Sequence, residues 1–187
     1  MRLGIWALAL CLAVPGTART SEWRVDESAS RIGFVASYDG VSFAGTFERW
    51  QAAITFTPGS VPVGSMRIEV GMASVNTRSR DRDKGMQGED WFWSRKFPLA
   101  RFIADDFERR DGHNYAADAT LSIKTRNVGL EIPFTWRLDG NAVRLQGELE
   151  VDRRDFDIGV GEWVNDGLIG FSVKIVYDLR LRAENPP

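Results

Sequence analysis

Apolar and polar residues alternate one by one through most of this chain, and this pattern limits the folds that it can adopt. Between residues 65 and 74, for example, Met66, Ile68 and Val70 alternate with Arg67 and Glu69. Such alternation is typical of a half-buried β-strand, because successive side chains of a strand point to opposite faces. We therefore expect an all-β protein with about eight strands, drawn from nine candidate runs: residues 23–37, 41–47, 53–57, 65–74, 99–107, 115–124, 132–138, 143–151 and 171–179.

Short turn signals separate several of these runs. Asp39-Gly40, Pro58-Gly59 and Asp139-Gly140 are suited to tight turns, and consecutive hairpins favour an antiparallel meander. Eight antiparallel strands can close into a barrel whose interior holds side chains or one small ligand. A two-sheet sandwich would show the same alternation. We favour the eight-stranded antiparallel barrel, formed as a single domain by residues 19–187.

The alternation is interrupted between residues 74 and 102. A charged run over residues 78–84 is followed by Trp91, Phe92, Trp93 and Phe97. Pro98 then ends any helix, because proline lacks the backbone N–H and restricts the residue before it. We expect a crossover with a short helix around residues 78–97, laid over the β body. Long insertions of this kind in compact domains are usually functional loops.

Two side-chain clusters in this crossover each allow two interpretations. Trp91, Phe92 and Trp93 cannot all face one way, so they either seal one end of a barrel or line the way into it. Arg78, Arg80 and Arg82 alternate with serine and aspartate. They form either a solvated, salt-bridged loop or a polar collar at the mouth of a cavity, in contact with a ligand headgroup or a membrane surface.

The first eighteen residues have the pattern of a secretory signal peptide. Arg2 precedes an apolar run over residues 5–14, and Gly16 and Ala18 occupy the positions that a signal peptidase inspects. We expect cleavage after Ala18 and export to the periplasm. Cys11 suggests a lipoprotein signal instead, but the residue before it is a leucine rather than a small residue. After cleavage the chain has no cysteine, so disulfides and thiolate ligands are excluded.

Catalytic and metal-binding residue types are sparse. The formal net charge of −2 argues against a nucleic-acid partner. His113 lies in a turn signal, and no serine has the context of a nucleophile, so a catalytic triad is not expected. The acidic pairs at 81/83 and 105/106 are read as surface ion-pairing groups, whereas for Asp155 and Asp157 a pair of facing carboxylates of the glycosidase type stays open. We expect no enzyme activity, no catalytic residue, no metal site and no required cofactor.

Several short blocks, in order and over residues 23–181, resemble the YceI-like family of exported proteins. They are Trp23-Arg24-Val25-Asp26, Gly45-Thr46-Phe47, Ser74-Val75-Asn76-Thr77, Arg82-Asp83, Asp90-Trp91-Phe92, Phe97-Pro98, Leu121-Ser122-Ile123 and Arg154-Asp155-Phe156-Asp157-Ile158-Gly159. The resemblance implies a lipocalin-like barrel that holds a polyisoprenoid, quinone-like or fatty chain in the periplasm, for carriage, storage or sensing. It also implies exchange with a membrane donor or acceptor and a homodimer.

On this basis we predict which residues bind an apolar lipid. The predicted tunnel wall consists of Phe34, Phe43, Phe47, Met66, Val70, Phe102, Phe134 and Phe156, with Trp91, Phe92 and Trp93 at or near the mouth. The alternative hypothesis is a non-catalytic module that binds glycan or protein through exposed tryptophans. It requires near-coplanar Trp91, Trp93 or Trp163 and a filled core, whereas a lipid carrier requires a long internal void.

Overall fold

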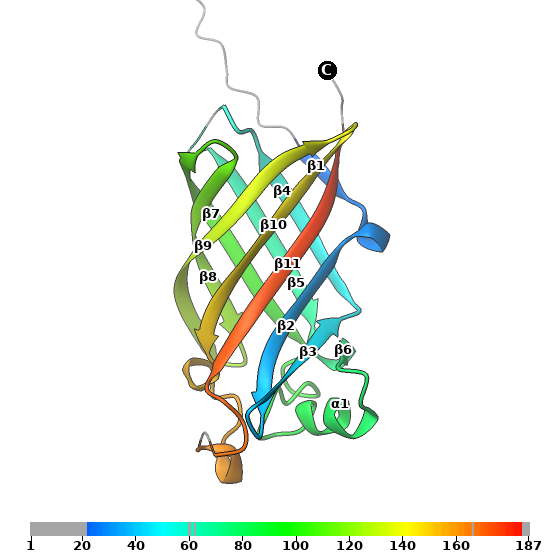
Figure 1. Cartoon of the computed structure of the whole chain (residues 1–187), viewed down its shortest axis with the longest axis vertical. Coiled ribbons are helices and arrows are strands. Elements are labelled where there is room, and N and C mark those ends of the chain that lie inside the picture. The colour runs from blue at the N-terminus through cyan, green and yellow to red at the C-terminus, as the bar shows by residue number, and fades with distance from the viewer. Residues whose placement is uncertain (1–21, 60, 62, 166, 185–187) are drawn as a thin grey trace, which may run out of the picture.

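The computed structural model describes residues 22–59, 61, 63–165 and 167–184, so the expected signal peptide lies outside the described residues. One twisted antiparallel sheet makes up most of the structure (Figure 1). Its strands are β1 (Glu22–Val25), β2 (Arg31–Tyr38), β3 (Val41–Phe47), β4 (Trp50–Phe56), β5 (Gly64–Gly71), β6 (Val75–Asn76), β7 (Leu99–Asp111), β8 (Asn114–Ile123), β9 (Arg126–Asp139), β10 (Ala142–Asp152) and β11 (Ser172–Ala183).

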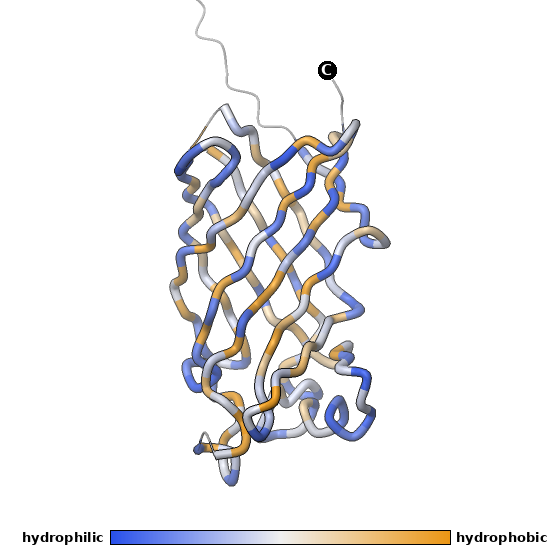
Figure 2. Tube along the Cα trace, viewed as in Figure 1, coloured by the Kyte–Doolittle hydropathy of each residue, from blue (hydrophilic) through white to orange (hydrophobic). Residues whose placement is uncertain are grey.

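The sheet closes on itself, which confirms the predicted barrel and excludes the two-sheet sandwich. The strand order runs β1-β4-β5-β7-β8-β9-β10-β11, and β1 pairs with both β4 and β11. These eight strands, counted over the described residues, form the closed ring. Strands β2, β3 and β6 continue the sheet from β11. Hydrophobic and hydrophilic residues alternate along the strands, as the sequence predicts (Figure 2).

The two ends of the barrel differ in their connections (Figure 1). At one end lie the β4–β5, β7–β8 and β9–β10 hairpins, the beginning of β1 and the end of β11. At the other end lie the crossover with helix α1 (Arg80–Met86) and the short 3-10 helices η3 (Arg153–Phe156) and η4 (Gly161–Trp163). Helix α1 falls within the predicted 78–97 crossover, and Ser79 caps its N-terminus. Two further 3-10 turns are η1 (Glu27–Ala29) and η2 (Met72–Ser74).

Aromatic side chains fill the hairpin end of the barrel interior. The ring of Phe56 is fully buried, and its centroid lies 4.8 Å from Trp136, 5.1 Å from Phe107 and 5.6 Å from Phe134. A register shift between Ala104 and Asp106 turns Phe107 inward. We call this end the filled half, defined by six aromatic residues: Trp23, Phe56, Phe107, Tyr115, Phe134 and Trp136.

One ladder of the barrel wall stops early. Strands β9 and β10 pair only from Asp139↔Ala142 to Thr135↔Gln146, whereas β9 stays paired with β8, and β10 with β11, to their far ends. Pro133 lies two residues before Thr135, and its carbonyl approaches Gly147 of β10. Because proline has no N–H, it cannot continue the ladder. The Tyr177 hydroxyl crosses from β11 and donates to the Pro133 carbonyl. A Cβ on Gly147 would overlap that hydroxyl, so glycine leaves the space for it.

Some boundaries differ from those that the sequence predicts. The β7 strand continues to Asp111 and β8 begins at Asn114, so both strands extend beyond the predicted runs 99–107 and 115–124 and meet in a tight hairpin around Gly112. Leu138 has the inward parity of β9, but its side chain is 81% exposed, because the strand end projects beyond the packed interior. Among the helices of the described residues, none has both the length and the hydropathy needed to cross a membrane.

Candidate functional site

The end of the barrel next to α1 encloses a cavity of about 730 Å³. This volume lies within the range of about 300–1,000 Å³ that ligand sites occupy. Inward-facing side chains of the barrel strands form its wall, and α1, η3 and η4 contribute to its outer end. The strand residues that line it include Phe34, Phe43, Phe47, Ile68, Val70, Ala100, Phe102, Leu121, Ile123, Leu130, Leu149, Val151, Val173 and Ile175. The lining is therefore overwhelmingly apolar.

The change from a packed to an empty interior occurs at one level of the barrel. Along β9, Trp136, Phe134 and Ile132 are buried, whereas Leu130 is half-buried. Along β11, Leu181 and Leu179 are buried, whereas Tyr177 and Ile175 are half-buried although they also face inward. Their exposed area faces the cavity. We call the part of the barrel that contains this cavity the hollow half.

Five aliphatic side chains form the inner end of the cavity. They both line it and belong to the cluster that packs against the aromatic residues of the filled half: Ile32, Met66, Ile132, Leu145 and Leu179. Each comes from a different strand, and all five are buried. We call this layer the floor of the cavity.

The outer end of the cavity is its mouth, where polar groups first appear. Of the three arginines in the charged run, all within the described residues, Arg82 lines the cavity while Arg78 and Arg80 are exposed. The Arg82 guanidinium carbon lies 4.2 Å from the centroid of Phe43, and its Nε donates to Thr77 Oγ1 at 3.1 Å. This arrangement resembles the predicted polar collar, with one arginine rather than three.

Arg153 fixes the loops on the other side of the mouth. Its side chain is 2% exposed, and its guanidinium donates to the carbonyls of Ile158, Gly159, Trp163, Asn165, Ile169 and Gly170 at 2.6–3.2 Å. Gly159 has a φ of +72°, and a Cβ there would overlap Arg153 Nη1. A cation that satisfies many carbonyls holds an otherwise irregular segment in one conformation.

A second polar contact joins the β8–β9 hairpin to the residue after η3. Arg126 donates to both carboxylate oxygens of Asp157, at 2.7 and 3.0 Å, and Lys124 Nζ donates to the Asp157 carbonyl at 2.7 Å. The hydrogen bond from Arg126 lowers the pKa of the Asp157 carboxyl, and partial burial lowers the pKa of Lys124. An ion pair and a lysine–carbonyl hydrogen bond thus hold the β8–β9 hairpin against this segment.

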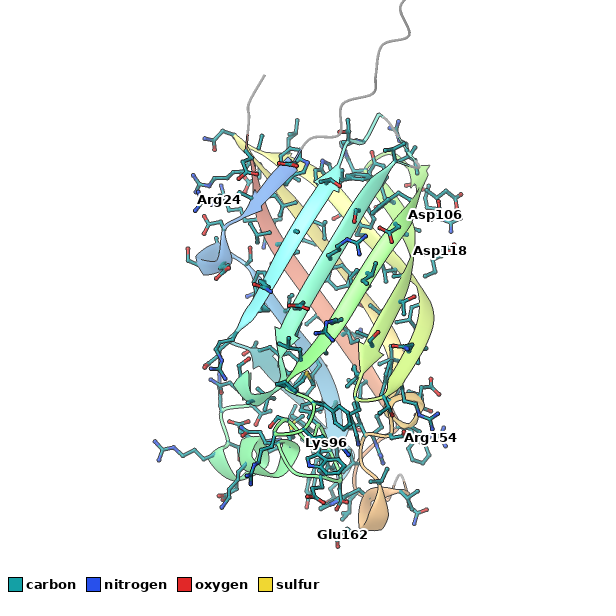
Figure 3. All side chains as sticks on the ribbon, turned by 180° about the vertical axis from the view of Figure 1, so that it is seen from behind. Arg24, Lys96, Asp106, Asp118, Arg154 and Glu162 are labelled. Atoms are coloured by element: carbon teal, nitrogen blue, oxygen red, sulfur yellow. The ribbon has the colours of Figure 1, made fainter. Side chains whose placement is uncertain are left out.

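The three successive aromatics of the crossover separate. Trp91 lines the mouth with its ring centroid 5.7 Å from Trp163, and the buried Phe92 lies 6.0 Å from Phe47. Trp93 was expected at or near the mouth; it lies beside Lys96 at the mouth end (Figure 3) but does not line the cavity. Its φ of +46° turns its ring toward Phe97, 5.8 Å away, and Lys96 Nζ lies 4.1 Å from the ring centroid.

The cavity brings together nine of the eleven residues predicted to bind lipid: Phe34, Phe43, Phe47, Met66, Val70, Trp91, Phe92, Phe102 and Phe156. Phe134 was expected in the tunnel but lies behind the floor, stacked on Tyr115 with a centroid distance of 5.5 Å. The prediction that Phe134 faces inward is correct. Its position along β9 is nearer the hairpin end than the cavity reaches.

Other lining residues were missed because they do not lie on alternating runs. Met86 comes from α1, Ile158 and Ile169 come from the loops around η4, and Arg153 comes from η3. An apolar residue in an irregular segment carries no periodic signal. Gly159 and Gly161 follow Phe156 and have positive φ angles, which allow the tight loop around Arg153. These glycines were the signal in the sequence that could have indicated a defined loop here.

Ionisable groups outside the mouth are placed on the surface. His113 is exposed in the β7–β8 hairpin, at the end of the barrel opposite the mouth. Asp106 and Asp118 project from the outer wall, as does Arg24, while Lys96, Arg154 and Glu162 lie at the mouth end (Figure 3). Asp83 accepts hydrogen bonds from the Thr77 backbone and hydroxyl at 2.8 and 2.6 Å. Among the described residues, no group of three potential metal ligands gathers.

Comparison with known proteins assigns the family. The model of the YceI-like domain matches residues 23–181, so this chain belongs to the YceI-like family. A UPF0312 protein of Photorhabdus laumondii is 28% identical over 131 residues, which cover 67% of each chain. Protein YceI of Salmonella arizonae is 24% identical over 161 residues, which cover 82% of this chain and 84% of its own.

Solved structures share the barrel. The crystal structure of Burkholderia cenocepacia BcnA superposes with a TM-score of 0.82 at 25% identity, covering 84% of this chain and 99% of BcnA. A polyisoprenoid-binding domain from Saccharophagus degradans, implicated in plant cell wall breakdown, has a TM-score of 0.69 at 18% identity and covers 88% and 99% of the two chains. The lipocalin-like barrel of the YceI-like family is therefore the fold of this protein.

Proposed function

We propose that this protein binds one long apolar lipid, such as a polyisoprenoid, a quinone-like molecule or a fatty chain, inside the hollow half of its barrel. The observation that carries the proposal is the apolar cavity of about 730 Å³, closed by the floor and open at the mouth. Membership of the YceI-like family supports a binding function rather than a catalytic one. The described polyisoprenoid-binding domain with the same fold supports an apolar ligand.

The distribution of polar groups suggests how such a ligand lies. The wall between floor and mouth is apolar, whereas Arg82 and Arg153 line the mouth. We propose that the apolar chain extends toward the floor and the polar end stays near these arginines. Burial contributes about 0.8 kcal/mol per methylene, so a forty-carbon tail would naively contribute about 30 kcal/mol, above the practical ceiling of about 20 kcal/mol. Chain ordering and competition from a bilayer offset much of this, which is consistent with reversible exchange.

Exposed apolar side chains at the mouth suggest where exchange takes place. Tyr38, Val41, Val164 and Leu168 are 47–69% exposed, and the β2–β3 turn is joined to the η4 loops by a hydrogen bond from Asp39 N to the Leu168 carbonyl. Apolar groups exposed around an opening are typical of surfaces that contact membranes or partners. We propose that this rim contacts a membrane donor or acceptor, and that the protein works in the periplasm after removal of residues 1–18, as carrier, store or sensor.

The alternative, a glycan- or protein-binding module built on exposed tryptophans, is less well supported. It requires near-coplanar exposed rings and a filled core. The planes of Trp91 and Trp163 are tilted by 56°, and Trp93 is half-buried against Phe97 and Lys96. The barrel core is filled at one end and empty at the other.

Native mass spectrometry of protein purified without detergent, before and after organic extraction, tests the proposal. We expect a bound species of lipid mass that extraction removes and added prenyl alcohols or fatty amides replace. Val70→Glu should abolish loading, because a charge in an apolar cavity is strongly unfavourable. Leu138→Glu, on the exposed end of β9, is the matched control and should load normally. An unliganded wild-type mass with no uptake of any offered lipid would overturn the proposed function.

A further inference from the structure

We propose that the floor sets the longest apolar chain that the cavity accepts, with Met66 and Leu145 as its principal length-determining residues. The proposal rests on the proposed function and specifies the ligand class at the same site. A barrel with two open ends would place no such limit on a chain threaded through it. Here the interior is open at the mouth and closed at the floor, so a chain that reaches the floor cannot advance further.

The floor joins two sides of the barrel. Met66 comes from β5, and the other four side chains come from the neighbouring strands β9, β10, β11 and β2. Met66 and Leu145 are 1% and 2% exposed, and both belong to the buried core cluster as well as to the cavity lining. They are therefore packed on the side of the filled half and face empty space only on the side of the mouth.

The layer behind the floor resists displacement. Phe56 contacts four other aromatic rings at centroid distances of 4.8–5.6 Å, and the Trp23 indole N–H donates to the Phe56 carbonyl at 2.7 Å. A close-packed aromatic cluster does not yield to a ligand without loss of these contacts. A ligand tail thus meets a fixed stop, and any excess length must remain at the mouth in contact with water.

Two substitutions should move the stop in opposite directions. Met66→Ala removes a flexible side chain from the floor and lengthens the cavity, since core structure relaxes only partly around such a deletion. Leu149→Trp adds bulk at a half-buried position that already faces the cavity, one inward position nearer the mouth than Gly147, and shortens it. Leu149 is half-buried at the edge of the core cluster and also lines the cavity, so the added bulk has empty space to extend into.

Val143→Ala provides the matched control. Val143 lies on the same strand as Leu145 and is 1% exposed, but it belongs to the filled half and does not line the cavity. Its truncation should lower stability without changing the length of the cavity. It therefore separates a specific effect of the floor from a general softening of the core.

The experiment offers delipidated full-length mature protein an equimolar mixture of geraniol, farnesol, geranylgeraniol and solanesol, and measures the occupancy of each alcohol by native mass spectrometry. For wild type, occupancy should rise with chain length and then level off or fall. We compare the occupancy of the first alcohol beyond this limit with that of the alcohol just below it. Met66→Ala should raise this ratio relative to wild type, and Leu149→Trp should lower it. The expected change is about fourfold or more for each methylene that the cavity gains or loses room for. Val143→Ala should leave the ratio unchanged.

The outcomes separate this inference from the proposed function. If wild type takes up none of the alcohols or any other offered lipid, the proposed function fails. If wild type loads them but Met66→Ala leaves the ratio unchanged, the floor does not set the length, whatever Leu149→Trp does. An equal change in Val143→Ala would likewise overturn the inference, because the ratio would then follow core stability.

Discussion

The filled half and the hollow half share strands β7, β8 and β9 but differ in what their inward positions carry. Toward the hairpin end, β4, β7, β8 and β9 contribute aromatic rings that interlock around Phe56. Toward the mouth, β5, β7 and β9 contribute Ile68, Val70, Phe102 and Leu130, which line a void. Neighbouring stretches of one sheet thus enclose a close-packed core and an empty container. The difference implies that stability resides mainly in one half and ligand binding in the other.

The largest effect should come from truncating the centre of the filled half. We expect Phe56→Ala to lower the free energy of unfolding by about 4 kcal/mol, because it removes a fully buried ring and leaves a cavity. Leu149→Ala, in the hollow half, should cost less than about 2 kcal/mol, since that side chain already lacks contacts on the cavity side. Urea unfolding followed by tryptophan fluorescence measures both. Equal losses would show that the two halves do not differ in stability.

A smaller but localised effect is expected at the mouth. Arg153→Lys keeps the charge but cannot reach six carbonyls, so we expect a loss of about 2 kcal/mol. Hydrogen exchange should accelerate at Ile158, Gly159 and Ile169 while amides of the filled half stay protected. Acceleration throughout the barrel would mean that the mouth and the filled half unfold as one unit.

At the boundary between the halves, the hydroxyl of Tyr177 supplies a smaller contribution. Tyr177→Phe should lower the free energy of unfolding by about 1 kcal/mol, because the Pro133 carbonyl loses its donor. Burial raises the pKa of Tyr177, so the hydroxyl remains a neutral donor through the physiological range. Chemical unfolding of the two proteins at neutral pH measures the change. A loss no greater than the error of the measurement would show that the contact does not stabilise the boundary.

The smallest effect concerns the outer wall, where the halves should not differ. Asp178 accepts from Arg144 at 2.8 and 2.7 Å and from Arg31 at 3.2 Å, and the hydrogen bond from Arg144 lowers the pKa of its carboxyl in the folded protein. Its contribution is therefore present above the unfolded pKa of about 3.9 and is lost as the pH falls through the folded value.

Asp178→Asn tests this pH dependence. At neutral pH it should cost about 1 kcal/mol or less, the usual range for ion pairs near the surface. The difference from wild type should shrink as the pH is lowered below about 4. Thermal unfolding over a pH series measures it. A difference that stays constant down to the acid limit would mean that the carboxylate charge is not responsible.

The wall of this barrel could be predicted from the sequence, whereas the division of its interior could not. Alternation identifies which residues face inward, and the comparison of strand runs with turn signals gives the antiparallel order. It does not reveal how far each inward residue lies along the barrel axis. Phe134 and Phe102 have the same parity and similar chemistry, yet Phe134 packs behind the floor and Phe102 lines the cavity. The bulge that turns Phe107 inward has no signal in a period of two.

The prediction of the candidate site was limited in the same way. Phe34, Phe47 and Val70 were located correctly because they lie on regular strands. Trp93 does not line the cavity, because its positive φ turns its ring away toward Phe97. Arg153 was not singled out, because the sequence does not distinguish a buried arginine that organises a loop from an exposed one. The signal peptide and its cleavage after Ala18 remain predictions from the sequence.

The early end of the β9–β10 ladder has a mechanical consequence. A cylinder whose hydrogen bonds run unbroken around its circumference has a fixed girth, because widening it requires breaking a ladder. In this barrel the ring is continuous around the aromatic end, but toward the mouth the β9–β10 ladder stops and Tyr177 of β11 bonds to Pro133 of β9 instead. We therefore expect the wall near the mouth to widen more easily than the aromatic end, whose diameter the continuous ladders hold.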